Sequence, residues 1–227
     1  MTKRCLLYYI TDRTQFAGDD RARRCSLIAK IAEASRAGVD YIQLREKDLG
    51  TRELEALARE CIALLEELRA ENRELRTSFL INSRTDVALA TGADGVHLRS
   101  NDLSPGEVRR IVGLTGERRK AESRFLIAVS CHTPDDVHRA ESQGADFAAF
   151  APVFEKKEAP AAEPTGCAAL REACTAKTPV LALGGVTIAN AASCLVAGAS
   201  GIAGIRLFQD NKIDDVVRAL RALSLTI

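Results

Sequence analysis

The sequence lacks the features of a membrane protein, a disulfide-stapled secreted domain and a nucleic-acid binder. It has 32 basic and 31 acidic side chains, so no net field would recruit nucleic acid or an anionic membrane. No apolar run reaches the length of a membrane span. The seven cysteines form no C-x-x-C pair and no secretory signal opens the chain. These absences predict a cytoplasmic protein with reduced, mostly buried thiols.

Eight short apolar runs are present, and they alternate with segments of helical period. The runs are Leu6–Thr11, Tyr41–Arg45, Phe79–Asn82, Gly95–Leu98, Phe125–Cys131, Phe147–Val153, Val180–Gly184 and Ile202–Phe208. Helix starts are marked by Ser104-Pro105-Gly106-Glu107 and Thr133-Pro134-Asp135-Asp136, each with a capping residue and proline at the first helical position. Alternating strands and helices predict a parallel sheet covered by helices.

An internal repeat indicates how that sheet closes. Gly38, Gly92, Gly144 and Gly198 each end a predicted helix and lead into a predicted strand, at separations of 54, 52 and 54 residues. We expect each glycine to be a left-handed helix cap. Four equal units of two strands and two helices favour a closed α/β barrel, so residues 1–227 are expected to form a single-domain (β/α)8 TIM barrel. In such a barrel the chemistry lies at the carboxyl ends of the strands.

Candidate ligand-binding side chains lie at the ends of the second and third runs. Gln43, Arg45 and Lys47 are expected on one side of their strand, with Leu44 and Glu46 on the other. A guanidinium at the barrel mouth suits a phosphate or carboxylate, and an ion-pair network at the rim that includes Glu46 is the structural alternative. Asn82 could donate and accept in the mouth.

Glycines at the ends of the last two runs suggest a phosphate site. The candidate residues are Gly184, Gly185, Gly204, Ile205 and Arg206. Loops at these positions of such barrels bind phosphate through backbone N–H groups, and glycine allows a close approach. Tight turns between strand and helix would also explain the glycines.

Histidine provides the candidate proton carrier. His132 follows the run Phe125–Cys131 and precedes a capped helix, so it could move a proton near neutral pH or contact a ligand. A structural role is the alternative. His97 is expected in or near the core and His138 on the surface of a helix. Cys131 is interpreted as a small buried hydrophobe rather than a nucleophile.

The chain resembles the thiamine-phosphate synthase family and its close relative, the thiazole tautomerase. The resemblance covers nearly the whole chain and rests on several motifs together. They are Leu7-Tyr8-Tyr9-Ile10-Thr11-Asp12, Gln43-Leu44-Arg45-Glu46-Lys47, Gly92-Ala93-Asp94-Gly95-Val96-His97-Leu98, Val129-Ser130-Cys131-His132, Ala151-Pro152-Val153-Phe154 and Leu183-Gly184-Gly185. The family pattern carries over to Gln43, Arg45, Lys47, Asn82, Asp102 and Ser130.

The synthases join a hydroxymethylpyrimidine diphosphate to a thiazole phosphate with Mg²⁺, and the chain departs from their pattern at three places. Ser83 stands where the family has a magnesium-binding aspartate, which leaves Asp102 as a candidate metal ligand; a capping role is its alternative. The family's threonine-x-threonine-lysine loop is replaced by Lys156, Lys157, Glu158 and Ala159, in a connection, Phe154–Thr165, that is a candidate lid. Arg206 replaces a serine near the thiazole phosphate. Lys156 or Lys157 could compensate from a shifted loop.

The features that the chain keeps resemble the tautomerase branch. That branch has asparagine, a small residue and arginine after the third strand, matched here by residues 82–84, and a histidine after the fifth, matched by His132. Our leading hypothesis is therefore a tautomerase-like enzyme that requires no cofactor. Arg45 would hold the carboxylate of a thiazole carboxylate phosphate, the loops of Gly185 and Arg206 the phosphate, and His132 would shuttle the proton. The alternatives are a Mg²⁺-dependent synthase and a non-catalytic protein that binds a phosphorylated ligand. The expected partner is this small molecule, and the sequence allows a homodimer without specifying one.

Overall fold

The computed structural model describes residues 4–114, 124–155 and 163–223. Its strands are β1 (Leu6–Ile10), β2 (Tyr41–Leu44), β3 (Ser78–Asn82), β4 (Gly95–Leu98), β5 (Leu126–Cys131), β6 (Phe147–Phe150), β7 (Val180–Ala182) and β8 (Gly201–Gly204). Its helices are η1 (Arg13–Gln15), α1 (Asp20–Arg36), α2 (Thr51–Glu71), α3 (Thr85–Thr91), α4 (Pro105–Leu114), α5 (Pro134–Ser142), α6 (Gly166–Ala173), α7 (Ala191–Val196), α8 (Arg206–Gln209) and α9 (Ile213–Leu223).

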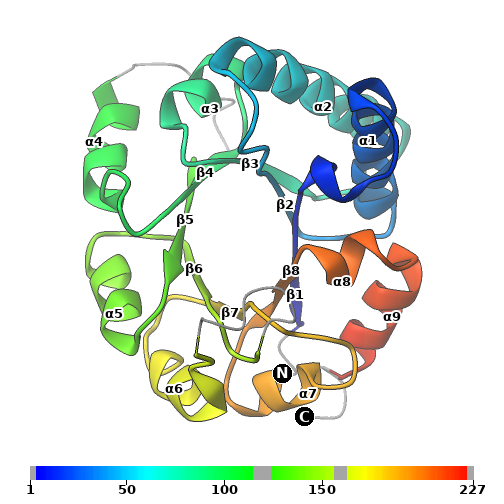
Figure 1. The fold of residues 1–227 in the computed structure, drawn as a ribbon. Helices are drawn as coiled ribbons and strands as arrows, with labels where there is room; N and C mark the ends of the chain where they lie inside the picture. Colours follow the sequence, from blue (N-terminus) through cyan, green and yellow to red (C-terminus); the bar gives the residue numbers. More distant parts are fainter. Residues whose placement is uncertain (1–3, 115–123, 156–162, 224–227) are drawn as a thin grey trace.

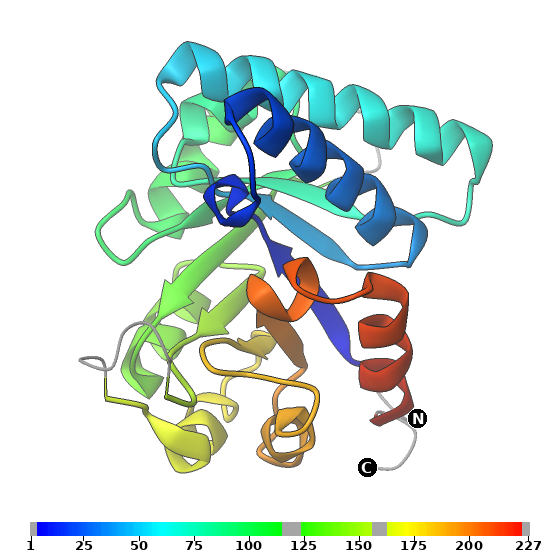
Figure 2. The ribbon, with the colours of Figure 1, turned by 45° about the vertical axis from the view of Figure 1, so that its right-hand side comes forward.

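The eight strands form a closed parallel barrel. Each strand pairs with the next in sequence, and β8 returns to β1 with Leu6 opposite Gly201. Figure 1 looks along the barrel and shows the helices as a ring outside it, and Figure 2 shows α1 and α2 running side by side along the outer surface. The predicted (β/α)8 barrel is confirmed.

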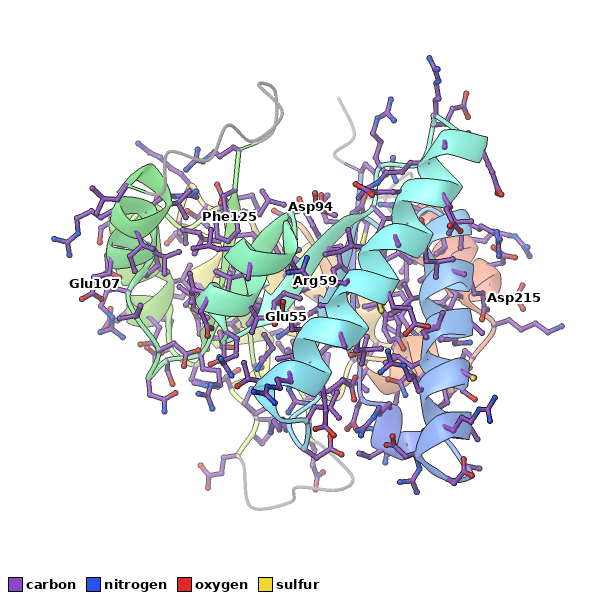
Figure 3. All side chains as sticks on the ribbon, turned by 90° about the horizontal axis from the view of Figure 1, so that it is seen from above. Glu55, Arg59, Asp94, Glu107, Phe125 and Asp215 are labelled. Carbon is purple, nitrogen blue, oxygen red and sulfur yellow. The ribbon has the colours of Figure 1, made fainter. Side chains whose placement is uncertain are left out.

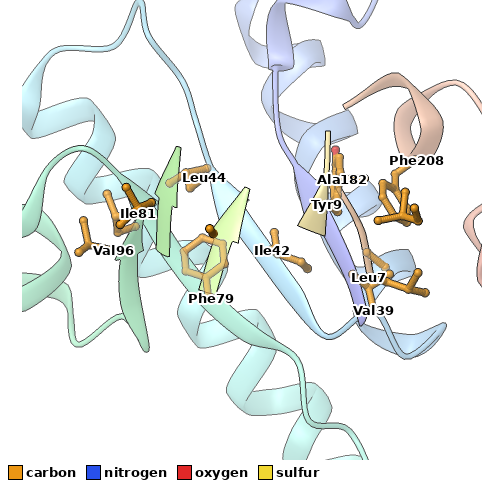
Figure 4. Close-up of a cluster of buried hydrophobic side chains, with 14 of the residues drawn as sticks. Leu7, Tyr9, Val39, Ile42, Leu44, Phe79, Ile81, Val96, Ala182 and Phe208 are labelled. Carbon is orange, nitrogen blue, oxygen red and sulfur yellow. The ribbon is translucent and has the colours of Figure 1, made fainter. Parts of the chain in front are cut away.

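Apolar side chains of the strands fill two separate layers. Tyr8, Leu80 and Phe147 pack inside the barrel. Their neighbours along the strands point outward and pack under the helices, as Figure 4 shows for Leu7, Tyr9, Phe79 and others. Strands that are buried on both faces explain why the sequence shows continuous apolar runs rather than an alternating pattern.

The predicted glycine repeat is confirmed in its backbone geometry. Gly38, Gly92, Gly144 and Gly198 have φ values of 81°, 74°, 82° and 104°. Residues with side chains are strained in this left-handed region, so glycine can end each helix and turn the chain into the next strand.

The same repeat carries a set of aspartates at the amino-terminal end of the barrel. In three of the four units the aspartate before an even-numbered strand accepts the backbone N–H of the preceding strand at 2.7 Å and pairs with an arginine from a helix. The aspartates are Asp40, Asp94 (labelled in Figure 3) and Asp146, with amide donors Leu7, Phe79 and Ile127 and arginines Arg221, Arg69 and Arg109. Ser200 occupies the fourth position. These aspartates tie the strand starts to the outer helices.

Both predicted helix starts are confirmed, whereas the last predicted strand is too long. Ser104 and Glu107 exchange hydrogen bonds at the start of α4, and Thr133 and Asp136 do so at the start of α5. The strand expected at Ile202–Phe208 ends at Gly204, and Arg206 begins α8. Arg206 is therefore an exposed residue of a short helix, not a strand end.

The outer faces of the helices are polar. Glu55 and Arg59, labelled in Figure 3, form an ion pair of 2.8 Å between successive turns of α2. Within the described ranges, no helix combines the length and apolar character needed to cross a bilayer.

Candidate active site

Gln43, Asn82, His97 and Ser130 come together inside the carboxyl end of the barrel. Asn82 lies opposite His97 in the sheet register, and Gln43 Nε2 donates to Asn82 Oδ1 at 2.8 Å. Gln43 is 1% exposed, and its Oε1 accepts no hydrogen bond in the described structure. A buried acceptor without a donor is costly, so this oxygen is available to an N–H or O–H group of a ligand.

His97 joins two other polar side chains inside the barrel. Its Nδ1 lies 2.9 Å from Tyr8 Oη, and its Nε2 lies 2.7 Å from Ser130 Oγ. The ring is 2% exposed, as the sequence predicted. Burial, aided by the positive charge of Arg45, lowers the pKa of His97 to about 3. The imidazole is therefore neutral at physiological pH.

Arg45 follows β2 on the same side as Gln43. Its backbone N–H donates to Thr11 Oγ1 at 2.9 Å, but its guanidinium forms no ion pair or hydrogen bond within the described residues. Burial lowers the pKa of Arg45, partly offset by the charges of Asp12 and Glu46. A partly buried guanidinium without a partner suits an anionic ligand. Lys47, two residues further on, is exposed.

The ion-pair network considered for Glu46 exists, but its cation is Arg13 rather than Arg45. Glu46 accepts from Thr11 Oγ1 at 2.5 Å and from the backbone N–H of Arg13 at 2.9 Å. The buried Arg13 guanidinium pairs with Asp48 at 2.7 Å and lies 3.8 Å from Glu46. Neither Thr11 nor Arg13, which follow β1, was predicted from the sequence as a residue of the site. Their network ties the segment after β1 to the end of β2, and among the described residues it leaves the Arg45 guanidinium without an ion pair.

Asp102, the candidate metal ligand, is occupied by protein donors. Ser83 Oγ donates to its Oδ2 at 2.7 Å, and Arg99 Nη2 donates to its Oδ1 at 3.0 Å. These hydrogen bonds outweigh partial burial and hold the pKa of Asp102 below its usual range. The described residues contain no group of three or more carboxylate, histidine or cysteine side chains suited to a metal. One carboxylate already paired with a guanidinium does not fit a protein-held Mg²⁺.

His132 lies at the end of β5 with its ring held in one orientation. Its Nδ1 is 2.7 Å from the Ala151 carbonyl oxygen. Because a carbonyl only accepts, Nδ1 carries a proton, and in the neutral form of the ring the Nε2 lone pair is available as a base. The neighbouring Cys131 is fully buried, and burial raises the pKa of its thiol to about 12. The interpretation of Cys131 as a buried hydrophobe is confirmed. His138, which was expected on the surface of a helix, lies half-exposed on α5.

Backbone geometry and close packing explain why both residues directly after Leu183 in the turn that follows β7 are glycines. Gly184 and Gly185 have φ values of 89° and 66°, and a Cβ on Gly185 would lie 2.7 Å from the Phe154 carbonyl oxygen and 2.5 Å from that of Glu155. Asn190 Nδ2 donates to the Gly185 carbonyl at 3.0 Å. The turn after β7 is therefore packed against the loop after β6. Such packing requires glycine whether or not a ligand binds.

The other predicted residues lie either at the end of β8 or in the segment 156–162, which is outside the described residues. Gly204 ends β8, with Ile205 immediately before α8. Lys156, Lys157, Glu158 and Ala159, and with them most of the candidate lid, lie outside the described residues.

Known proteins of one family match this chain over nearly its whole length. The family described as thiamine monophosphate synthase matches residues 7–208. The thiamine-phosphate synthase of Methanoculleus marisnigri is 39% identical over 223 residues, covering 96% of this chain and 92% of its own. That of Methanoregula boonei is 37% identical over 219 residues, covering 96% and 90%. The solved structure of thiamine phosphate pyrophosphorylase from Pyrococcus furiosus superposes with a TM-score of 0.76 at 28% identity, covering 99% and 98%.

These matches span the barrel and every strand that contributes to its mouth. The relatives carry the name of the synthase, so they favour the synthase alternative over our leading hypothesis from the sequence, the tautomerase. The chain belongs to the thiamine-phosphate synthase family.

Proposed function

We propose that this chain is a thiamine-phosphate synthase that joins hydroxymethylpyrimidine diphosphate to a thiazole phosphate. The observation that carries the proposal is the likeness, over nearly the whole chain, to proteins named for this activity. In the reaction the carbon–oxygen bond to diphosphate breaks and the diphosphate keeps the electron pair. The thiazole nitrogen then forms a bond to the resulting cationic carbon. No redox cofactor is required.

The residues of the barrel mouth support this chemistry through charge and hydrogen bonding. Arg45 provides a desolvated positive charge for the departing diphosphate, where such charges stabilise a transition state strongly. The Oε1 of Gln43, which has no donor among the described residues, suits an N–H or O–H group of the pyrimidine substrate. Lys47 would add positive charge at the rim. Asn82 fixes the Gln43 amide through its own side chain.

The thiazole phosphate is assigned to the turns after β7 and β8. Because residues 184 and 185 are glycines, no side chain would stand between the backbone of this turn and an approaching anion. Gly204 and Ile205 lie at the end of the adjacent strand. Arg206, exposed in the first turn of α8, would provide positive charge from the rim.

The arrangement at Asp102 does not fit the Mg²⁺ that the family resemblance implies, so no step is assigned to a metal. The Arg99 guanidinium lies against the carboxylate where a cation would bind. Arg99 is 52% exposed in its side chain, whereas Asp102 is 10% exposed, so the positive charge faces solvent and can be reached by a ligand.

A second candidate function, thiazole tautomerisation, is favoured by His132. With Nδ1 bonded to the Ala151 carbonyl, Nε2 can take a proton from a substrate carbon and return it elsewhere. That reaction needs no metal, in agreement with the state of Asp102. Arg45 would hold the substrate carboxylate.

The two activities are separated by incubating the purified full-length protein with each substrate set. Synthase activity predicts thiamine phosphate from hydroxymethylpyrimidine diphosphate and thiazole phosphate, detected by mass spectrometry. Arg45→Gln should lower that turnover, while His132→Gln should leave it nearly unchanged. Isomerisation of a pure thiazole carboxylate phosphate, abolished by His132→Gln, would instead establish the tautomerase. Tight binding without turnover of either set would support the non-catalytic alternative.

A further inference from the structure

Tyr8, His97 and Ser130 form a hydrogen-bonded row inside the barrel. They come from β1, β4 and β5; β4 and β5 pair directly, and closure of the barrel brings Tyr8 of β1 to them. The Tyr8 side chain is fully buried and packs against the His97 ring with centroids 5.7 Å apart. The row runs from Tyr8 Oη to His97 Nδ1 at 2.9 Å, and from His97 Nε2 to Ser130 Oγ at 2.7 Å.

Protonation chemistry fixes the direction of the first bond. Burial raises the pKa of the Tyr8 phenol well above its usual value, so the hydroxyl keeps its proton. His97 Nδ1 is the hydroxyl's hydrogen-bonding partner in the described structure. If Nδ1 were the donor, the phenolic proton would be left buried without an acceptor, at a cost of about 1–3 kcal/mol. Tyr8 therefore donates and Nδ1 accepts.

The direction of the second bond follows from the first. A neutral imidazole carries one N–H, and with Nδ1 accepting, that N–H is Nε2–H. Nε2 must then donate to Ser130 Oγ. The single proton of the Ser130 hydroxyl is left over, and no acceptor for it lies among the described residues. Ser130 is only half-buried, at the carboxyl end of β5, so this proton can reach a ligand in the mouth.

We propose that Tyr8 and His97 are positioning residues that commit the Ser130 hydroxyl as a hydrogen-bond donor to an anionic oxygen of the substrate. This rests on the proposed synthase function, in which the oxygen belongs to the diphosphate. Without the row, Ser130 could turn its proton toward the imidazole and present a lone pair to the anion. Neither Tyr8 nor His97 touches the ligand.

The direction of the row can be measured without substrate. Nitrogen-15 NMR of histidine-labelled full-length protein reports which ring nitrogen carries the proton, and the chain has three histidines. We expect His97 as the Nε2–H tautomer and His132, which donates from Nδ1 to Ala151, as the opposite one. His132 is thus an internal control. A protonated His97 at neutral pH, or its Nδ1–H tautomer, would overturn the proposal whatever the protein catalyses.

The effect on the anion is measured with Tyr8→Phe and a matched control. Tyr41→Phe removes a phenol from the same aromatic cluster, since Tyr41 packs edge-on to Tyr8 at 6.0 Å, but it leaves the His97 bond intact. Calorimetry with inorganic diphosphate should show about 5- to 10-fold weaker binding for Tyr8→Phe and no change for Tyr41→Phe. Equal losses in both variants would contradict the proposal.

A double-mutant cycle separates positioning from general damage. In the background of Ser130→Ala, Tyr8→Phe should have no further effect on diphosphate affinity, because the hydroxyl it directs is absent. Additive losses would overturn the proposal. If the protein binds diphosphate in this pattern but produces no thiamine phosphate, the row stands and the proposed function fails. If turnover is normal and the cycle is additive, the reverse holds.

Discussion

Arg99 and Asp102 form an ion pair at the carboxyl end of β4, with Nη2 and Oδ1 3.0 Å apart. Ser83 completes the arrangement from the end of β3 by donating to the other carboxylate oxygen at 2.7 Å. Ser83 has a φ of 65°, an uncommon value for a residue with a side chain. The loops after β3 and β4 are therefore joined by the hydrogen bond between Ser83 and Asp102.

The protein is expected to bind Mg²⁺ weakly in the absence of substrate, and replacing two residues should change this. The double variant Ser83→Asp with Arg99→Gly places two carboxylates together and removes the competing cation. Magnesium at ten times its dissociation constant should then stabilise the fold by about 1.4 kcal/mol, measured as a rise in Tm. The wild type should show little shift at the same concentration.

The control for this experiment makes the same charge change elsewhere. Ser142→Asp with Arg218→Gly alters exposed positions on α5 and α9, far from Asp102 in sequence. It should respond to magnesium as the wild type does. An equal rise in Tm for the wild type would show that Asp102 binds the metal despite Arg99.

His97 should make the stability of the protein depend on pH. Its pKa is about 3 in the folded protein, whereas that of an unfolded histidine is about 6.5. Between these values the unfolded chain binds more protons, so the free energy of unfolding rises with pH, by up to about 1.4 kcal/mol per pH unit. Above about pH 6.5 the effect is complete.

Comparison of variants isolates this effect from that of the carboxylates. His97→Gln should flatten the rise of the unfolding free energy between about pH 5 and 6.5. His138→Gln, at a half-exposed position on α5, should keep it. Denaturant titrations at several pH values provide the measurement. A wild-type slope retained in His97→Gln would show that His97 is not the group responsible.

Local patterns in the sequence were sufficient to predict the barrel, and the reason is visible in its repeats. A left-handed glycine followed by an apolar strand is a short-range signal, and it recurs four times. The end of β8 was predicted wrongly because Leu207 and Phe208 extend the apolar run of the sequence. In the structure they are buried residues of the short helix α8. Periodicity does not distinguish a strand from a single buried helical turn.

The features of the site that the sequence predicted depend on adjacent residues, whereas those it missed depend on residues far apart in the chain. Alternation along β2 correctly placed Gln43 inside the barrel, because it depends only on adjacent residues. The bond between Tyr8 and His97 joins residues 89 apart, and that between Thr11 and Glu46 joins residues 35 apart. No local pattern encodes such pairs. Arg99 was missed because an exposed loop arginine has no distinguishing signal in one sequence.

Asp146 should be important for stability, although it lies far from the active end. It accepts the Ile127 N–H at 2.7 Å and pairs with Arg109 and Arg124. Asp146→Ala leaves the Ile127 amide without its acceptor and removes the carboxylate partner of Arg109, and should cost about 2–3 kcal/mol in unfolding free energy. Asp215→Ala, which breaks only an exposed pair (Asp215 is labelled in Figure 3), should cost at most ~0.5 kcal/mol. Similar losses in urea titrations would refute the role of Asp146.

Gly185→Ala tests how closely the turn after β7 packs against the loop after β6. The new methyl would meet the carbonyl oxygens of Phe154 and Glu155 at 2.7 Å and 2.5 Å, in addition to the strain of a positive φ. Gly144→Ala is the matched control, because Gly144 also has a positive φ but nothing within 4 Å of the added atom.

The two variants should therefore differ by the overlap alone. We expect Gly144→Ala to cost ~1 kcal/mol from backbone strain, and Gly185→Ala a further ~1–3 kcal/mol from overpacking. Because the displaced backbone adjoins the proposed phosphate site, Gly185→Ala should also raise the KM for the thiazole phosphate, and Gly144→Ala should not. Equal losses of stability in denaturant titrations would mean that the loop after β6 moves aside at no cost, and that its contact with Gly185 does not shape the site.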